Sequence, residues 1–319
     1  MMSLRRIFPL LLVLLWMSPA QSAPREYHLQ ARQVATDVYV LVGRNEHFSF
    51  DNGGNIVNTG FIVADEGVIV IDTGPSKQYG EAMRAAIGRV TDKPVVQVFI
   101  SHLHPDHFLG NQGFAGSTIS ALPGTVQGIK AQGELFNDAM YRMVGPWMKG
   151  TEVIVPKPLS VEPTVQVAGR ELQLIELSGH SGDDLAIFDR DSGVLFAADS
   201  VFFERTATTP HADIQHWLND LELLSRIPFK VLVPGHGPVV SDQSAIEQTA
   251  DYLRWLHENL TQRAEQGDSM PEALTPHASG SRFFDLAVFR EEYQRSVAHL
   301  YPQIEQRAMA RGKVKQSEP

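Results

Sequence analysis

Short apolar runs bounded by turn-forming residues recur along most of this chain, which is the pattern of buried strands. Longer segments with apolar residues at helical spacing lie between and after them, and this alternation predicts a mixed α/β fold. The expected strands are residues 34–43, 61–64, 68–71, 95–100, 117–121, 170–177, 185–188, 194–198 and 231–233. The expected helices are residues 79–90, 108–114, 213–224, 241–266 and 283–307.

Residues 125–148 interrupt this pattern and are expected to form an irregular insertion. Their methionine and aromatic residues, such as Met143 and Trp147, fit either core packing or a wall of a substrate pocket. Ser241 or Asp242 is expected to cap the helix that follows. We divide the chain into a catalytic domain at residues 23–265 and a helical extension at residues 266–319 with a disordered tail.

Composition indicates a globular protein. Of the 319 residues, 43% are apolar and 20% are charged, and this is enough apolar material for a sizeable core. The formal net charge of −10 argues against a nucleic-acid partner, which requires a basic surface. The chain has no cysteine, so it forms no disulfide and offers no thiolate ligand or nucleophile.

Residues 1–22 have the features of a signal peptide. Arg5 and Arg6 precede a short apolar core at residues 7–17, and Ala20-Gln21-Ser22 suits cleavage. The apolar core is shorter than the ~20 residues that span a bilayer, so we expect a periplasmic protein without stable membrane insertion. An uncleaved anchor is the alternative. Cleavage would remove two arginines and no acidic residue, changing the charge from −10 to −12.

The strongest chemical signal is Ser101-His102-Leu103-His104-Pro105-Asp106-His107, which follows an expected strand. Pro105 cannot continue a strand ladder because it has no N–H, so the chain turns there. A helix then starts near Asp106, whose carboxylate suits a first helical turn. Imidazole nitrogens and carboxylate oxygens that converge around such a turn are the ligands that Zn²⁺ accepts.

Three later strands end in the same way, each with one metal-binding side chain in the following turn. These side chains are His180, Asp199 and His236. Because all of these turns follow strands, we expect them at one edge of the sheets. The sequence therefore predicts one shared metal site rather than scattered surface histidines.

The pattern His-x-His-x-Asp-His with a distant His, Asp and His resembles the metallo-β-lactamase superfamily over residues 38–240. The resemblance implies a four-layer αββα sandwich and a site for two zinc ions. It implies that Asp72 orients the ligands from behind, as a partner to the metal loop. It also implies a first zinc held by His102, His104 and His180, a second held by Asp106, His107 and His236, and Asp199 between the two.

Within the superfamily, the chain is most similar to the quinoprotein relay system zinc metallohydrolases, on residues 55–72, 90–94 and 234–238. His104 stands where flavo-diiron relatives have a glutamate, so iron is less expected than zinc. Asp199 stands where the common β-lactamases have a cysteine, and this arrangement is similar to thioester hydrolases and lactonases. The resemblance thus implies hydrolysis of a small molecule.

We expect water activated by the two metals to attack the carbonyl of a small-molecule ester, thioester, lactone or lactam. Asp106 is expected to take part in catalysis by directing a proton to the leaving group. The alternatives are β-lactamase activity and an accessory role beside a periplasmic quinoprotein partner. An iron-containing, sulfur-oxidising relative is a weaker alternative.

Four residues are candidates to face the substrate: Phe48, Phe50, Asn55 and His211. Phe48 and Phe50 precede Asn52-Gly53-Gly54-Asn55, which is a strong turn signal. This segment is either a flap over the site or an ordinary hairpin with its aromatic residues in the core. His211 lies in the segment after Asp199 and could approach the substrate from there.

Overall fold

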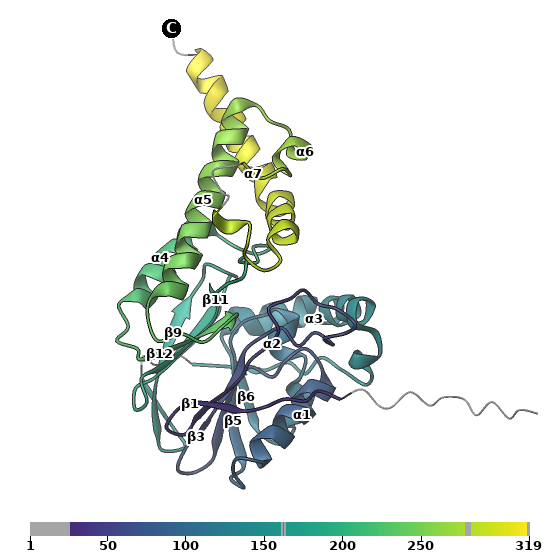
Figure 1. Cartoon of the computed structure of the whole chain (residues 1–319), viewed down its shortest axis with the longest axis vertical. Coiled ribbons are helices and arrows are strands. Elements are labelled where there is room, and N and C mark those ends of the chain that lie inside the picture. Colours follow the sequence, from purple (N-terminus) through teal and green to yellow (C-terminus); the bar gives the residue numbers. More distant parts are fainter. Residues whose placement is uncertain (1–25, 161, 163, 278–281, 318–319) are drawn as a thin grey trace, which may run out of the picture.

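The computed structural model describes residues 26–160, 162, 164–277 and 282–317 (Figure 1). Two β-sheets face each other, and helices cover their outer faces. The expected signal peptide lies outside the described residues. No helix in the described part of the chain has both the length and the apolar character to cross a membrane.

The first sheet has seven strands in the order β1-β2-β3-β4-β5-β6-β7. It is antiparallel from β1 to β4 and parallel from β4 to β7. Its strands are β1 (Arg32–Ala35), β2 (Val38–Leu41), β3 (Thr59–Val63), β4 (Val68–Ile71), β5 (Val95–Ile100), β6 (Thr118–Ala121) and β7 (Lys157–Pro158).

The second sheet has five strands in the order β12-β11-β10-β9-β8. Only the β11–β12 pair is parallel, and its register shifts at Ala198, directly before the predicted ligand Asp199. Its strands are β8 (Val165–Val167), β9 (Arg170–Leu177), β10 (Asp184–Asp189), β11 (Val194–Phe202) and β12 (Val231–His236). Asp199 therefore lies within an irregular strand rather than in the turn after it.

Helices surround both sheets. On the side of the first sheet lie α1 (Lys77–Gly88), α2 (Pro105–Phe108), the 3-10 turn η1 (Asn111–Phe114), α3 (Pro123–Val144) and the 3-10 turn η2 (Gly145–Met148). The remaining helices are α4 (Ile214–Ser225), α5 (Ser244–Gln266), α6 (Met270–Ala273) and α7 (Phe289–Ser317). In Figure 1, α5 and α7 run side by side away from the sandwich.

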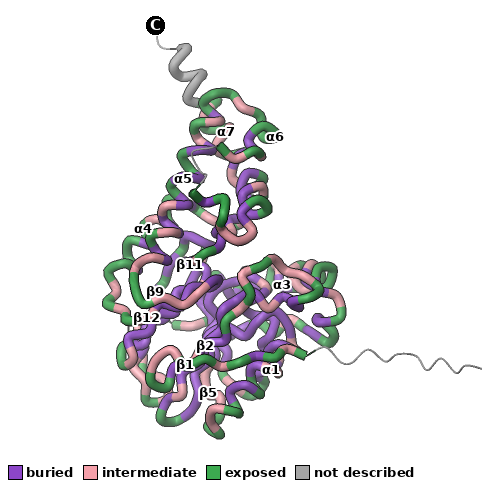
Figure 2. The backbone as a smooth tube through the Cα atoms, in the orientation of Figure 1, coloured by how far each residue is buried: buried purple, intermediate pink, exposed green. Residues whose placement is uncertain are grey.

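Buried apolar side chains of the described residues form three clusters, one at each boundary between layers. One lies between the sheets and joins residues such as Ile69 of β4 to Phe196 of β11. A second packs the first sheet against α1 and α3. The third packs the second sheet against α4, α5 and α7. Three apolar boundaries define four layers, which confirms the predicted αββα sandwich, and Figure 2 shows the burial concentrated in the sheets.

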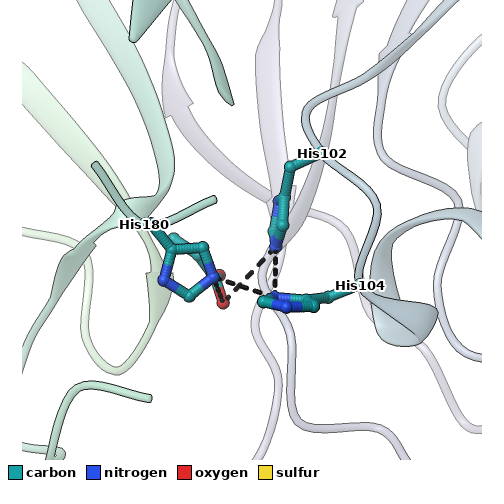
Figure 3. A group of neighbouring side chains, drawn as sticks. His102, His104 and His180 are labelled. Carbon is teal, nitrogen blue, oxygen red and sulfur yellow. Dashed lines mark hydrogen bonds and ion pairs between the residues drawn. The ribbon is translucent and has the colours of Figure 1, made fainter. Parts of the chain in front are cut away.

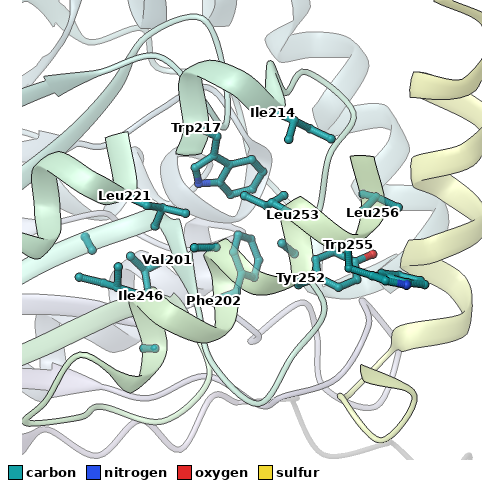
Figure 4. Close-up of a cluster of buried hydrophobic side chains, with 14 of the residues drawn as sticks. Val201, Phe202, Ile214, Trp217, Leu221, Ile246, Tyr252, Leu253, Trp255 and Leu256 are labelled. Carbon is teal, nitrogen blue, oxygen red and sulfur yellow. The ribbon is translucent and has the colours of Figure 1, made fainter. Parts of the chain in front are cut away.

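The third cluster extends without interruption into the C-terminal helices. Trp217 of α4 and Phe202 of β11 pack at one end, and Trp255 of α5 packs at the other (Figure 4). Trp255 also contacts Phe289 and Tyr293 of α7. The helices after residue 266 thus share a core with the second sheet.

Three expectations about the helices were wrong. Residues 123–144 form a helix rather than an irregular insertion, and the glycines at positions 124, 128 and 133 obscured its helical pattern. Gly133 lies close to Val153, since a Cβ there would be 2.8 Å from its side chain. Helix α5 starts at Ser244, and neither Ser241 nor Asp242 is its N-cap. Asp242 instead accepts a hydrogen bond from the backbone N–H of Ser244. Residues 312–317 of the expected disordered tail continue α7.

Candidate metal centre

The loop after β5 carries the predicted ligands His102 and His104, and Pro105 then opens α2, which carries Asp106 and His107. Pro105 suits the first helical position because its missing N–H would have no partner there. Two carboxylate oxygens of Asp72 accept hydrogen bonds from the backbone N–H and the hydroxyl of Ser101, both at 2.8 Å. Asp72 therefore ties the start of this loop to the end of β4.

His102, His104 and His180 point their ring nitrogens at one another (Figure 3). Nδ1 of His104 lies 2.9 Å from Nε2 of His102 and 2.9 Å from Nε2 of His180. Three lone pairs that converge in this way repel one another unless a cation lies between them. Ligand atoms around a tetrahedral zinc ion lie about 3.3 Å apart, so a small movement would seat one.

Asp199 connects this group to a second one. Its Oδ2 lies 3.4 Å from Nε2 of His180 and 3.8 Å from Nε2 of His102. Its Oδ1 faces the other way, 3.1 Å from Nε2 of His107 and 3.3 Å from Nε2 of His236. One carboxylate thus presents an oxygen to each group, as a bridging ligand would.

Asp106, His107 and His236 form the second group. Oδ2 of Asp106 lies 3.4 Å from Nε2 of His236 and 3.8 Å from Nε2 of His107. Within each of the two groups, the ligand atoms all lie within 4.8 Å of one another, and every residue is buried. The structure therefore brings all the predicted ligands together in the predicted division.

Hydrogen bonds on the far side of the rings fix which nitrogen faces the site. Nδ1 of His107 donates to Oδ2 of Asp72 at 2.8 Å, as expected for a residue that orients a ligand. Nδ1 of His236 donates to the backbone carbonyl of Ile56 at 2.8 Å. In both residues, this leaves the Nε2 lone pair directed at the other ligands.

Two residues outside the predicted ligand set hold the ligand loops in place. The buried amide of Asn58 donates to the carbonyls of Pro234 and Gly237, at 2.9 and 2.8 Å, and so clamps the loop that carries His236. The buried carboxylate of Asp184 accepts hydrogen bonds from the backbone N–H groups of His180 and Ser181. Asp184 thus caps the turn that carries His180, and its carboxylate is buried.

Gly235 is a third such position. A Cβ there would lie 2.0 Å from Oδ1 of Asp199, so the carboxylate can occupy its place only beside a glycine. No local sequence pattern signals the contacts of Asn58 and Gly235, because their partners are distant along the chain.

A cavity of about 320 Å³ opens over the ligands. Phe48 and His211 line it, and Nδ1 of His211 lies 2.8 Å from Nε2 of His104. Phe50 and Asn55 are not among its lining residues. Ring atoms of Trp147 pack on Gly53, and its Nε1 donates to the carbonyl of Phe50, so the segment is a loop fastened to the core. Phe48 both lines the cavity and packs partly against the core, so the flap and the hairpin interpretations of this segment each hold in part.

The family model that describes the metallo-β-lactamase superfamily matches residues 52–236, which is more than half of the chain. The chain belongs to the metallo-β-lactamase superfamily. The two ligand groups give it a candidate site for two metal ions.

Curated members of the superfamily that resemble the chain act on different esters. The linear primary-alkylsulfatase of Pseudomonas sp. is 24% identical over 294 residues, covering 77% of this chain and 54% of that protein. The chain thus spans about half the length of that relative. Acyl-coenzyme A thioesterase MBLAC2 of Bos taurus is 23% identical over 236 residues, covering 64% of this chain and 81% of that protein.

Solved structures of the superfamily share the fold. A metallo-β-lactamase from Pontibacter korlensis has a TM-score of 0.58 and 21% identity, covering 71% of this chain and 99% of its own. The sec-alkylsulfatase Pisa1 from Pseudomonas sp. has a TM-score of 0.67 and 18% identity, covering 86% of this chain and 50% of its own. At these identities, the likeness concerns the fold alone.

Burial and neighbouring charges determine the protonation states of the candidate metal ligands. Burial, together with neighbouring imidazoles, lowers the pKa values of His102, His104 and His180 well below the ordinary value. Burial alone would raise the pKa of Asp199, but His236 and His107 outweigh it and hold that pKa well below the ordinary value. The site thus offers neutral imidazoles and an ionised carboxylate, the forms that bind metal.

His107 differs from the other histidines. Burial alone would lower its pKa, but the carboxylates of Asp199, Asp72 and Asp106 outweigh burial and raise it well above the ordinary value. Nε2 of His107 and Oδ1 of Asp199 are buried, and neither has a well-aligned hydrogen bond within the described part of the chain. Unpartnered buried atoms that face one another fit a cation between them. The donor set of imidazoles and carboxylates therefore fits two metal ions.

Proposed function

We propose that this protein is a binuclear zinc hydrolase that cleaves a small ester, thioester, lactone or lactam by adding water to its carbonyl. The observation that carries the proposal is the carboxylate of Asp199, which presents one oxygen to each of two complete ligand groups beneath an open cavity. A ligand set of imidazoles and carboxylates without cysteine suits zinc. Iron accepts the same ligands, so metal analysis has to separate the two.

Two zinc ions bound there would supply an activated water and would polarise the bond to be cleaved. The residues of the chain do the rest. Asp106 lines the cavity and is buried, with Oδ2 directed at His236. We assign it the transfer of a proton to the leaving group. His104 and Asp199 also line the cavity, so a substrate there lies against both ligand groups.

A sulfate ester is a second candidate substrate. The cavity contains the guanidinium groups of Arg205 and Arg295, which suit a sulfate. The sec-alkylsulfatase Pisa1, whose likeness covers 86% of this chain, supports this candidate by its name. Hydrolysis of a β-lactam is a third candidate, which the same assay tests.

We also propose that the protein works in the periplasm and serves a quinoprotein oxidation system. The signal-peptide pattern of residues 1–22 supports the location, and residues 55–72, 90–94 and 234–238 support the association. An accessory role without catalysis is the alternative within this setting. A complete set of ligands favours catalysis, because a binding module has no need of it.

The test is metal analysis and turnover of the purified chain against a thioester, a lactone, a chromogenic cephalosporin and an alkyl sulfate. We expect about two zinc ions per chain and chelator-sensitive hydrolysis of one carbonyl substrate. Asp106→Ala should abolish turnover while the fold is retained. Hydrolysis of the alkyl sulfate alone would replace the carbonyl proposal, and two zinc ions with no turnover would favour the accessory role.

A further inference from the structure

Helix α7 supplies two charged side chains to the cavity, Glu292 and Arg295, although it lies outside the residues that match the superfamily model. Nη1 of Arg295 lies 3.7 Å from Oε1 of Glu292, one helical turn away. Nδ1 of His47, from the loop after β2, lies 3.6 Å from the same oxygen. The C-terminal helix therefore contributes two of the three charged side chains that line the cavity outside the metal ligands.

Glu292 and a second charged residue of the cavity, Arg205, are buried without a full set of hydrogen-bond partners in the described part of the chain. The Glu292 side chain is 2% exposed, and its Oε2 accepts no hydrogen bond from the described residues. Arg205 is 3% exposed; its Nη1 donates to the carbonyl of Glu46, but its Nε has no partner in the described part of the chain. Burying charges in this way is costly unless a polar group meets them. Arg205 lines the cavity, so a negatively charged group of a bound ligand can meet its guanidinium there.

The balance of charge favours an anion. Outside the metal ligands, the cavity contains the cations Arg205 and Arg295 and one carboxylate, that of Glu292. Burial lowers the pKa of His47 despite the neighbouring Glu292, so this imidazole adds no charge near neutral pH. Arg295 lines the same cavity as His211, whose Nδ1 lies 2.8 Å from Nε2 of His104. The cationic wall thus lies close to the metal loop.

The rest of the cavity is apolar. Phe48 comes from the loop after β2, and Phe136 and Met143 come from α3. The ring of Phe136 lies 6.4 Å from those of both His104 and His211. A molecule that fills the cavity therefore meets cations on one side and hydrocarbon on another, both beside the metal ligands.

We propose that Arg295 and Arg205 bind an anionic group of an amphiphilic substrate, either a carboxylate or a sulfate, while Phe48, Phe136 and Met143 bind its apolar chain. Glu292 positions Arg295 for this contact. Helix α7 thereby determines which substrates the metal centre receives. This inference rests on the proposed hydrolytic function for its biological meaning, but binding of the anion can be measured without turnover.

The test measures binding of three probes that hydrolysis cannot consume: octanoate, octanesulfonate and the neutral octanol. Each is titrated into the zinc-loaded full chain and into the chelator-treated chain by calorimetry. The variant is Arg295→Gln, and its matched control is Arg290→Gln, an exposed arginine of the same helix that does not line the cavity. Thermal unfolding of both variants checks that the fold is retained.

We expect at least one anion to bind tenfold or more tightly than octanol. Arg295→Gln should weaken that anion at least tenfold and leave octanol unchanged, while Arg290→Gln should match the original chain. Preference for octanoate or for octanesulfonate tells a carboxylate from a sulfate substrate. The inference would be overturned if octanol bound as tightly as both anions. It would also be overturned if chelation abolished anion binding while Arg295→Gln left it unchanged. Failure of every hydrolysis assay would leave these results intact and would count against the proposed function alone.

Discussion

Asp72→Asn tests whether the second metal position depends on the proton of one histidine. Asp72 has a φ of 58°, and asparagine tolerates this left-handed conformation about as well as aspartate, so the backbone should keep its shape. The side-chain carbonyl oxygen of the introduced asparagine can still accept from the backbone N–H of Ser101. The amide nitrogen, however, replaces the oxygen that accepts from Nδ1 of His107 at 2.8 Å.

The expected consequence is a change of tautomer. With an N–H group facing its Nδ1, His107 gains a hydrogen bond only by accepting there and carrying its proton on Nε2. That nitrogen lies 3.1 Å from Oδ1 of Asp199, where the second metal would bind. Loss of such an orienting partner typically weakens metal binding 10–100-fold, which is about 1.4–2.7 kcal/mol. The first group should be less affected, since the Ser101 hydroxyl still reaches Nδ1 of His102 at 3.0 Å.

The assay is a zinc titration of the metal-free chain against a chromophoric chelator, which resolves the two affinities. Asp72→Asn should bind one zinc ion normally and the other 10–100-fold more weakly. Asp65→Asn, a change at an exposed aspartate between β3 and β4, is the matched control and should bind both normally. Two unchanged affinities would refute the tautomer argument. Equal weakening of both would show that Asp72 acts by shaping the loop instead.

Three further substitutions test the supports of the site. Asn58→Ala removes three side-chain hydrogen bonds, two of them buried, and should lower the free energy of unfolding in urea by about 3 kcal/mol. Gly235→Ala should displace Asp199 and abolish binding of both zinc ions in the same titration, whereas Gly182→Ala, where a Cβ meets nothing within 4 Å, should not. Burial raises the pKa of Asp184 to about 7, although the hydrogen bonds from Ser181 lower it. The carboxyl group therefore binds its proton more tightly in the folded chain than in the unfolded chain. The free energy of unfolding should therefore fall by at most about 4 kcal/mol as pH rises from about 4 to about 7. Urea unfolding at a series of pH values measures this dependence, and Asp184→Asn should remove it.

The ligands could be predicted from sequence because each is a chemically distinctive residue directly beside a recognisable strand. His102 and His104 follow β5, and His180 lies three residues beyond the end of β9. The strand pattern alone places such residues at sheet edges, and the family motif assigns them to metals. Asp72 belongs to the same class, since it follows β4 and its bond to Ser101 joins neighbouring parallel strands.

The supports at Asn58 and Gly235 could not be predicted, because they depend on contacts between segments far apart in sequence. Asn58 lies 176 positions from Pro234, whose carbonyl it binds, and nothing in either segment specifies the other. Helix α3 was missed for a related reason. Its glycines lower local helix propensity, but Gly133 lets the helix approach Val153 closely, and that gain exists only in the folded chain.

Helix α7 shows the consequence for function. Its apolar stripe was visible in the sequence, and this stripe packs Phe289, Tyr293 and Val297 into the third cluster. That packing fixes the rotation of the helix, and the rotation in turn directs Glu292 and Arg295 to the cavity. Because the ligands fall within residues 52–236 and these charges do not, changes in α7 could alter the substrate while the metal chemistry stays the same. A chain with Arg295→Gln should therefore retain its zinc content in full while its preference for anionic over neutral ligands is lost.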